Sequence, residues 1–240
     1  MRFIISELPY ERPIARGLWR YSLDGRPTGA VEQWRLSAAH EGFQFLRVDL
    51  DARAAPSGRS YLYHLVLDEA GRPLRLKYRF WEGSHETVGN IRLEPDAVLQ
   101  TAGRAESRQE TILAVPAGYR FWFPACSALG LLAKERRNGE SAAVHLQLVE
   151  DESGGAELKL ATTRLRQEER LLTVTAEDVA MIVDLRWEGQ QRTIGLNAAG
   201  WPVRMTRQDR LTAKESQFVA YQRITAPGDD SQVRQAGQAP

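Results

Sequence analysis

The residues with the most chemical potential stand singly along the chain. The four histidines are His40, His64, His85 and His145, and the one cysteine is Cys126. No HExxH or CxxC spacing occurs, and neither a glycine-rich phosphate loop nor a Gly-x-Ser-x-Gly elbow is present. These are the patterns that hold zinc, phosphate groups or an activated serine. The sequence therefore predicts no metal site and no cofactor.

Two places remain where acid–base or nucleophilic chemistry is conceivable. The segment "WEGSHET" (81–87) places Glu82 close to His85, and a Glu–His pair can transfer protons. A solvated hairpin end explains these residues equally well, and His64 and His145 are expected to be partly exposed strand histidines. Cys126 begins a helix-like segment, where a helix dipole can lower the pKa of a thiol. Its aromatic and leucine neighbours favour a buried, inert thiol, so no catalytic residue is predicted.

The elements that would position these side chains are β-strands. In "LRLKYRFW" (74–81), two sets of side chains alternate: Leu74, Leu76, Tyr78 and Phe80 on one face, and Arg75, Lys77 and Arg79 on the other. Such alternation is typical of a half-buried strand. "YLYHLVLD" (61–68) alternates too, and "DEAGRP" supplies turn residues, so 61–81 is predicted to be a β-hairpin. Because alternation separates the cations from the aromatic residues, we expect no stacking platform for bases and no nucleic-acid partner.

The pattern of this hairpin recurs later in the chain. "LDEAGRPLRLKYRFW" (67–81) and "LNAAGWPVRMTRQDR" (196–210) share Leu-x-x-Ala-Gly-x-Pro-apolar-Arg-apolar, and "YSLDGRPTGAVEQW" (21–34) is a weaker relative. A shared turn idiom would explain the echo, but the strands on both sides favour a structural duplication. Further turn signals separate strand-like runs, which gives roughly a dozen strands, as expected of a meandering all-β protein.

One segment breaks the alternation, "VPAGYRFWFPACSALGLLAKERRNG" (115–139). It is the most apolar and aromatic part of the chain. Its end has the composition of a short helix, with Ser127 as a candidate N-cap, cations in the last turn and Gly139 as a stop. A crossover that joins two half-sheets and lays a short apolar helix against their concave side would have this composition.

Composition narrows the class of protein. Charged residues make up 26% of the 240 residues and the net charge is +1, so no global field favours nucleic acid or an anionic membrane. No apolar run approaches the roughly 20 residues of a membrane span. The first residues, "MRFIISELPYERP", lack the apolar core and cleavage site of a secretory signal. We therefore expect a cytoplasmic protein without an integral membrane segment.

These observations predict an all-β fold, a large antiparallel half-barrel or β-clam with one short helix in the central crossover. We expect a single β domain over 1–225, built from related halves at about 10–114 and 140–225 and joined by the crossover at 115–139. The tail at 226–240 has no periodicity and little apolar content, so it is expected to be disordered.

The segments "YSLDGRPTG", "LDEAGRPLRLKY" and "VPAGYRFWFP" give the chain a further resemblance. In layout, residues 10–224 resemble the open-barrel superfamily that includes the lipoprotein localisation factors, and in particular its cytoplasmic glycolipid-binding branch. That branch has a Gly-Cys followed by an Asp-x-Asp stretch and a Thr-Pro-Phe-Thr-Asn run, and this chain has none of them. No ligand-binding residue is therefore carried over. The resemblance implies a cupped sheet that holds an acyl chain or glycolipid.

Three hypotheses for function follow. The first is a non-enzymatic carrier or sensor of a hydrophobic small molecule or lipid, bound in a barrel cavity. The candidate lining residues are Phe45, Tyr63, Tyr78, Phe80, Tyr119, Trp122, Phe123 and Trp187. Arg75 and Arg204 occupy equivalent repeat positions, and alternation favours the solvated face for Arg75. The second is an interaction or scaffold protein that forms a homodimer through exposed sheet edges. The third is a hydrolase or isomerase that uses Glu82 with His85 or His64.

Overall fold

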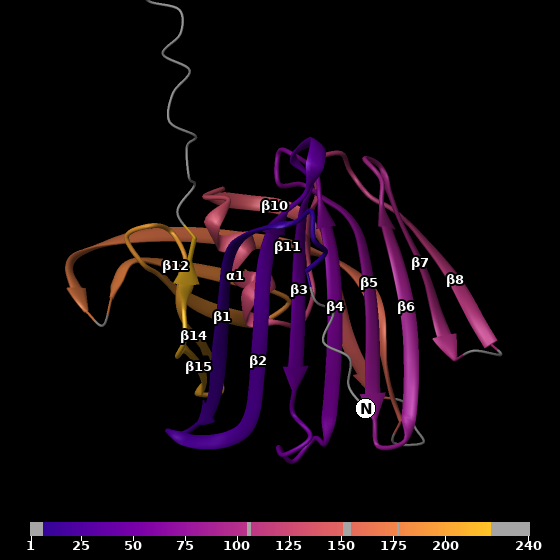
Figure 1. Ribbon diagram of the computed structural model, residues 1–240, viewed down its shortest axis with the longest axis horizontal. Helices are drawn as coiled ribbons and strands as arrows, with labels where there is room; N and C mark the ends of the chain where they lie inside the picture. Colours follow the sequence, from indigo (N-terminus) through magenta and orange to yellow (C-terminus); the bar gives the residue numbers. More distant parts are fainter. Residues whose placement is uncertain (1–6, 105–106, 151–154, 177, 222–240) are drawn as a thin grey trace, which may run out of the picture.

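The computed structural model describes residues 7–104, 107–150, 155–176 and 178–221 (Figure 1). Within these residues 16 strands form one sheet, which does not close on itself, and one α-helix accompanies it. The predicted all-β open half-barrel with a single helix in the crossover is therefore confirmed. The predicted disorder at 226–240 lies outside the described residues.

The first half of the chain builds a continuous antiparallel meander. Its strands are β1 (Arg12–Leu23), β2 (Arg26–Ala38), β3 (Gln44–Asp51), β4 (Arg59–Leu67), β5 (Pro73–Glu82), β6 (His85–Leu93), β7 (Ala97–Arg104) and β8 (Ser107–Ala114). Each strand pairs with its neighbour in sequence, and a 3-10 turn, η1 (His40–Gly42), links β2 to β3. The predicted hairpin at 61–81 is the pair β4–β5, with Tyr63 opposite Tyr78.

The second half begins at the far edge of the sheet and returns to the first strand. Its elements are β9 (Arg120–Trp122), α1 (Cys126–Lys134), β10 (Gly139–Glu150), β11 (Ala156–Ala176), β12 (Val179–Trp187), β13 (Gln190–Leu196), β14 (Pro202–Arg207), β15 (Leu211–Glu215) and β16 (Val219–Ala220). Among the described strands, only the short β9 pairs in parallel, with β10. Because β15 pairs with β1, the two halves join along β1, and β8 and β9 are the two ends of the strand order.

The repeated Leu-x-x-Ala-Gly-x-Pro pattern builds the same turn twice. In the β4–β5 turn, the Asp68 carboxylate accepts from the backbone N–H groups of Ala70 at 2.9 Å and Arg72 at 2.8 Å. In the β13–β14 turn, the Asn197 side chain accepts in the same way from Ala199 at 3.1 Å and Trp201 at 2.8 Å. The glycine of each turn has a positive φ, 78° and 77°, which glycine adopts without steric cost. The repeated sequence pattern therefore encodes one type of turn, in which the side chain of the first turn residue accepts two backbone N–H groups.

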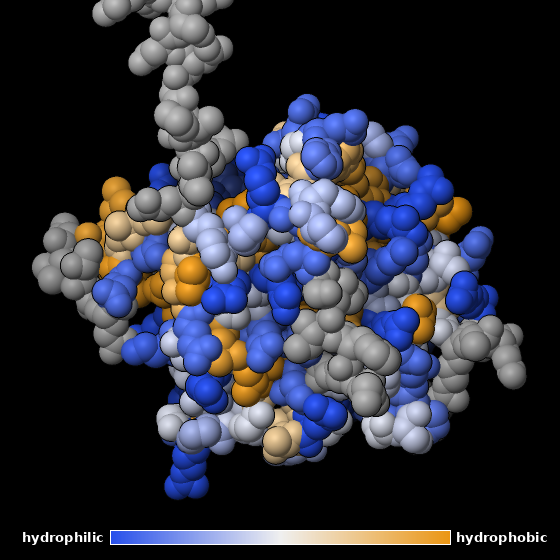
Figure 2. Space-filling model, in the orientation of Figure 1, coloured by the Kyte–Doolittle hydropathy of each residue, from blue (hydrophilic) through white to orange (hydrophobic). Residues whose placement is uncertain are grey.

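A single apolar core lies between the strands of the two halves. Figure 1 shows β1–β5 in front of β10–β12, with α1 between the two layers. The link across the interior is direct, since the Gln100 side chain donates to the carbonyl of Leu158 at 2.9 Å and to the Tyr78 hydroxyl at 2.8 Å. Figure 2 shows the outer surface, where hydrophilic side chains predominate over β1–β6. The described part of the chain has no helix long and apolar enough to span a bilayer.

Candidate apolar ligand site

An apolar slot of about 310 Å³ opens between the crossover and strands β2–β5. Its walls are apolar side chains of the strands, the crossover and the helix: Leu36, Leu65, Leu67, Phe121, Trp122, Phe123, Ala128, Leu131 and Leu132. The β4–β5 turn closes one side with Ala70, Gly71 and Pro73, and the polar side chains at its border are Gln44, Lys134 and Glu135. The volume of the slot lies at the lower end of the range of small-molecule pockets.

The helix that forms one wall begins at a buried carboxylate. Glu32 of β2 is 0% exposed, and its two oxygens accept the N–H groups of Cys126 and Ser127, each at 2.8 Å. The Tyr21 hydroxyl donates to the same carboxylate at 2.5 Å. Burial raises the pKa of Glu32, against these hydrogen bonds, which lower it. The predicted N-cap at Ser127 is wrong, because Ser127 lies inside α1 and a strand from the first half supplies the cap.

The other end of α1 is fixed by a buried cation. Arg120 of β9 has a side chain that is 1% exposed, and it donates to the carbonyl of Leu132 at 2.6 Å. It also pairs with Glu135 at 3.2 Å. An anion at the start of a helix and a cation at its end both complement the helix dipole. The slot wall is therefore fixed to β2 at one end and to β9 at the other.

Close packing sets the position of α1 over the second half. A Cβ built on Gly130 would lie 2.3 Å from the Cγ of Pro202 in β14, so only glycine permits this approach. At the outer turn of the helix, Lys134 places its Nζ 3.4 Å from the centre of the Trp201 ring. Burial lowers the pKa of Lys134. This cation borders the slot and is stabilised by an aromatic face.

Two of the predicted lining residues, Trp122 and Phe123, border the slot. Tyr63, Tyr78, Phe80 and Trp187 are buried in the core, and Tyr119 is partly buried against it. The aromatic side chains fill space rather than enclose it. Tyr63 lies 4.4 Å from Phe123 between ring centres, for example. The structure thus brings seven of the eight together in or against one core, and two of these border the slot.

The eighth residue, Phe45, lies on the opposite, outer face of the sheet. Leu46 and Val48 occupy the inward positions of β3, so Phe45 must point outward. It packs edge-on against His64 at 5.5 Å and under the guanidinium of Arg47 at 5.3 Å. The prediction that Phe45 lines the interior is therefore wrong by one residue along the strand. In "FQFLRVDL" (43–50) apolar residues stand at neighbouring positions, so the sequence does not show which set faces the core.

A buried ionic cluster supports this part of the outer face. Glu11 and Arg47 form two charged hydrogen bonds, at 2.6 and 2.7 Å, and their side chains are 0% and 6% exposed. Ser37 donates to the same carboxylate at 2.5 Å. Burial alone would raise the pKa of Glu11, but the hydrogen bonds from Arg47 and Ser37 outweigh it and hold this pKa below its ordinary value.

The residues considered for catalysis either make structural hydrogen bonds or lie away from one another. Glu82 accepts from Arg59 at 2.7 Å and from the N–H of Ala156 at 2.8 Å, while His85 is exposed in the next strand. Burial and the neighbouring Arg47 lower the pKa of His64 to about 4, so His64 is neutral near pH 7. Cys126 is buried, and burial with the charge of Glu32 raises the pKa of its thiol well above the ordinary value.

His145 was predicted to be a partly exposed strand histidine. That prediction is wrong, because its exposed fraction is 4%. Its ring stacks on Trp122 with a centroid separation of 4.7 Å and an interplanar angle of 3°. Burial lowers the pKa of His145. Across the described ranges, no three His, Cys, Asp or Glu side chains come close enough together to hold a metal ion.

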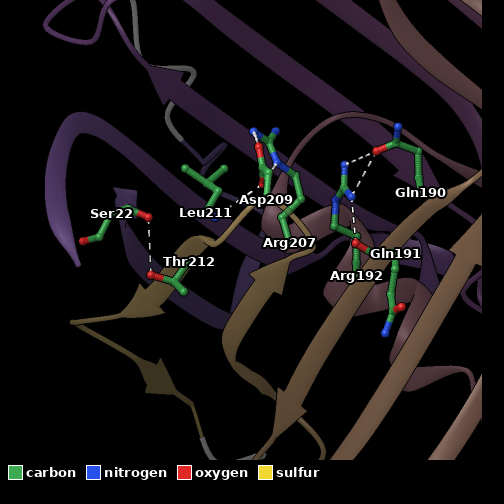
Figure 3. A network of polar contacts seen from close by, with 8 residues as sticks. All are labelled: Ser22, Gln190, Gln191, Arg192, Arg207, Asp209, Leu211 and Thr212. Atoms are coloured by element: carbon green, nitrogen blue, oxygen red, sulfur yellow. Dashed lines mark hydrogen bonds and ion pairs between the residues drawn. The ribbon is translucent and has the colours of Figure 1, made fainter. Parts of the chain in front are cut away.

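A second polar cluster lies at the ends of β13 and β14 and in the turn that follows (Figure 3). Arg207 donates from Nε to Asp209 Oδ1 at 2.6 Å. Arg192 donates to the carbonyl of Gln191 at 2.8 Å and to the side chain of Gln190 at 3.3 Å. Burial and the neighbouring Arg207 lower the pKa of Arg192 to about 10. The Arg207–Asp209 contact lies at the β14–β15 turn and the Arg192 contacts stay at the start of β13, so each stabilises its local backbone.

Sequence reasoning missed Glu32 and Arg120, the two residues that fix α1. For Glu32 a signal existed, because "AVEQWRL" (30–36) places a carboxylate in phase with Trp34 and Leu36, which point into the core. An acid in the buried phase of a strand requires a partner in the interior. No comparable pattern marks Arg120 in "GYRFWF" (118–123), where both faces of β9 are buried. Comparison of the chain with protein-family models, curated proteins and solved structures found no match.

Proposed function

We propose that this protein is a non-enzymatic carrier or sensor of a hydrophobic ligand with a medium-length acyl chain, bound in the slot between α1 and β2–β5. The observation that carries the proposal is the slot itself, about 310 Å³ with leucine and aromatic walls. The proposal is limited to this slot, because Tyr63, Tyr78, Phe80 and Trp187 are buried in the core.

The slot sets both the size and the polarity of the ligand. Each buried methylene group contributes about 0.8 kcal/mol, so a chain in this slot can reach useful affinity in spite of the entropic cost of association. Lys134 and Gln44 at the border offer hydrogen-bond donors to a carboxylate or another polar head group. The ligand would therefore place its apolar chain against the helix and its polar end beside Lys134.

Titration of octanoate, laurate and palmitate against a displaceable apolar fluorophore tests this proposal. Leu131→Trp fills the slot from a partly buried position and should weaken laurate binding at least tenfold while the melting temperature is kept. The matched control is Leu171→Trp, at a side chain that is 78% exposed on β11, and it should bind as the parent does. Absence of saturable binding by the parent, or equal binding by both variants, would refute the proposal.

A homodimer through a sheet edge is the second candidate. β8 ends the strand order of the described sheet, so its outer edge presents backbone groups that a second strand can pair with. Ile112 on β8 is 68% exposed and would add apolar contact to such a pairing. Light scattering tests this directly. Ile112→Lys should convert a dimer to a monomer, whereas Leu171→Lys should not; a parent that is monomeric at high concentration excludes the dimer.

A further inference from the structure

We propose a second binding site, for a small molecule that carries closely spaced phosphate groups, on the outer face of β4–β8. The site is a hollow of about 880 Å³, called here the basic groove and bordered by Arg75, Lys77, Arg79, Arg108, His64 and Trp81. It lies on the face of the sheet opposite the apolar core, so it is independent of the acyl-chain proposal.

Strand register explains how these cations come to share one surface. His64 of β4 lies opposite Lys77 of β5, and Lys77 lies opposite Asn90 of β6. Residues two apart on a strand point the same way, so Arg75 and Arg79 flank Lys77 on this face. Cross-strand pairing continues from Arg79 through one residue each of β6 and β7 to Arg108 on β8, so Arg79 and Arg108 lie in one row across the sheet. Five neighbouring strands, β4–β8, therefore line one basic surface.

The charge of the groove is concentrated rather than balanced. Arg75, Lys77, Arg79 and Arg108 contribute four positive charges, and Glu86 contributes one negative charge, so the groove carries about +3 while the whole chain carries +1. Within the described residues, no carboxylate lies within ion-pairing distance of Lys77 or Arg108. Glu86 reaches Arg79 only at 3.5 Å, with both side chains about half exposed. Arg75, Lys77 and Arg79 lie at alternate positions of one strand, so their like charges repel one another, and a bound anion would reduce this repulsion.

The walls of the groove add two features to the charge. Trp81 points outward with the cations, because it follows the inward-facing Phe80, so the expectation that every aromatic residue of this strand faces away from the cations is wrong. It is half-buried and provides a flat apolar wall together with Leu62 and Val88. The Nε2 atom of His64 is enclosed and has no hydrogen-bond partner. The guanidinium forks of the arginines and the ammonium group of Lys77 match phosphate oxygens.

The size of the groove indicates a small molecule rather than a polymer. Its volume falls within the range of small-molecule sites. The arginine and lysine donors fit two or more phosphates, and the apolar wall fits a ring or chain attached to them. Free polyphosphate and a nucleoside triphosphate share this chemistry, and binding measurements separate them.

Calorimetric titration of the full chain with inorganic tripolyphosphate and with ATP at low ionic strength tests the site. The variant Lys77→Glu with Arg79→Glu should lose at least tenfold in affinity for either probe. The control is Lys159→Glu with Arg164→Glu, which makes the same charge change at side chains 54% and 83% exposed on β11 and should change affinity less than twofold. Tighter binding of ATP assigns a role to the apolar wall, and equal affinities assign recognition to the phosphates alone.

Three results would overturn the proposal: no saturable heat with either probe, an equal loss in the groove and control variants, or binding only of single-stranded oligonucleotides. Failure here leaves the acyl-chain proposal intact, since laurate binding is measured with Leu131→Trp on the other face. Circular dichroism of the variants confirms that the exposed substitutions leave the sheet folded.

Discussion

Substitution of Glu32 by alanine tests how the wall of the slot is held in place. The Glu32 carboxylate accepts the N–H groups of Cys126 and Ser127 and the hydroxyl of Tyr21. Glu32→Ala leaves three buried donors without an acceptor, and each costs about 1–3 kcal/mol. Removal of the desolvation cost of a buried charge offsets part of this loss. We therefore expect the free energy of unfolding to fall by about 3–5 kcal/mol.

For a chain of 240 residues, 1 kcal/mol corresponds to roughly 2–4 °C in melting temperature, so the expected decrease is on the order of 10 °C. Urea denaturation and calorimetry measure both quantities. Tyr21→Phe removes one of the three donors and should cost about 1.5 kcal/mol. Glu140→Ala is the surface control, because its side chain is 52% exposed, and it should cost less than 1 kcal/mol.

The expected loss is also local. Hydrogen exchange of the Cys126 and Ser127 amides should accelerate more than that of the β4–β5 ladder, because these amides lose their acceptor directly. Laurate binding should weaken in parallel, since α1 forms one wall of the slot. A loss of less than 1 kcal/mol for Glu32→Ala would refute this reasoning and would mean that the cost of burying the carboxylate cancels its hydrogen bonds.

Two further predictions concern buried groups outside the slot. Glu11→Ala should cost about 3–5 kcal/mol because it leaves the charge of Arg47 buried without its partner, and the Glu11→Ala, Arg47→Met double variant should recover most of this loss in urea denaturation. Because the folded-state pKa of Glu11 lies below its ordinary value of 4.5, its contribution is complete above that pH and is lost as the pH falls through the lowered pKa. The unfolding free energies of the parent and Glu11→Gln should therefore converge in acid; a constant difference would contradict the ion pair. Cys126 should resist an aromatic disulfide reagent in the native state and react fully in denaturant, because the thiol is buried and its pKa is raised; rapid native labelling would contradict this.

Much of the local structure could be predicted because alternation and turn chemistry act over a few residues. The β4–β5 and β13–β14 hairpins follow from period-two patterns around Gly-x-Pro turns, and α1 follows from a short leucine-rich segment between an aromatic run and Gly139. The phase of β3 was the exception. "FQFLRVDL" permits either face for Phe45, and only pairing with β2 and β4 selects the inward Leu46 and Val48.

The sequence by itself indicated roughly a dozen of the 16 strands, the Gly-x-Pro turns and the single apolar helix, because backbone geometry and side-chain period are properties of neighbouring residues. Tertiary structure decided what these elements enclose. Pairing of β15 with β1 joins the two halves into one sheet, the carboxylate of Glu32 meets the start of a helix 94 residues away, and aromatic residues of both halves pack into one core. These outcomes depend on contacts between distant segments and on how side-chain volumes sum in three dimensions, and no local pattern encodes that sum.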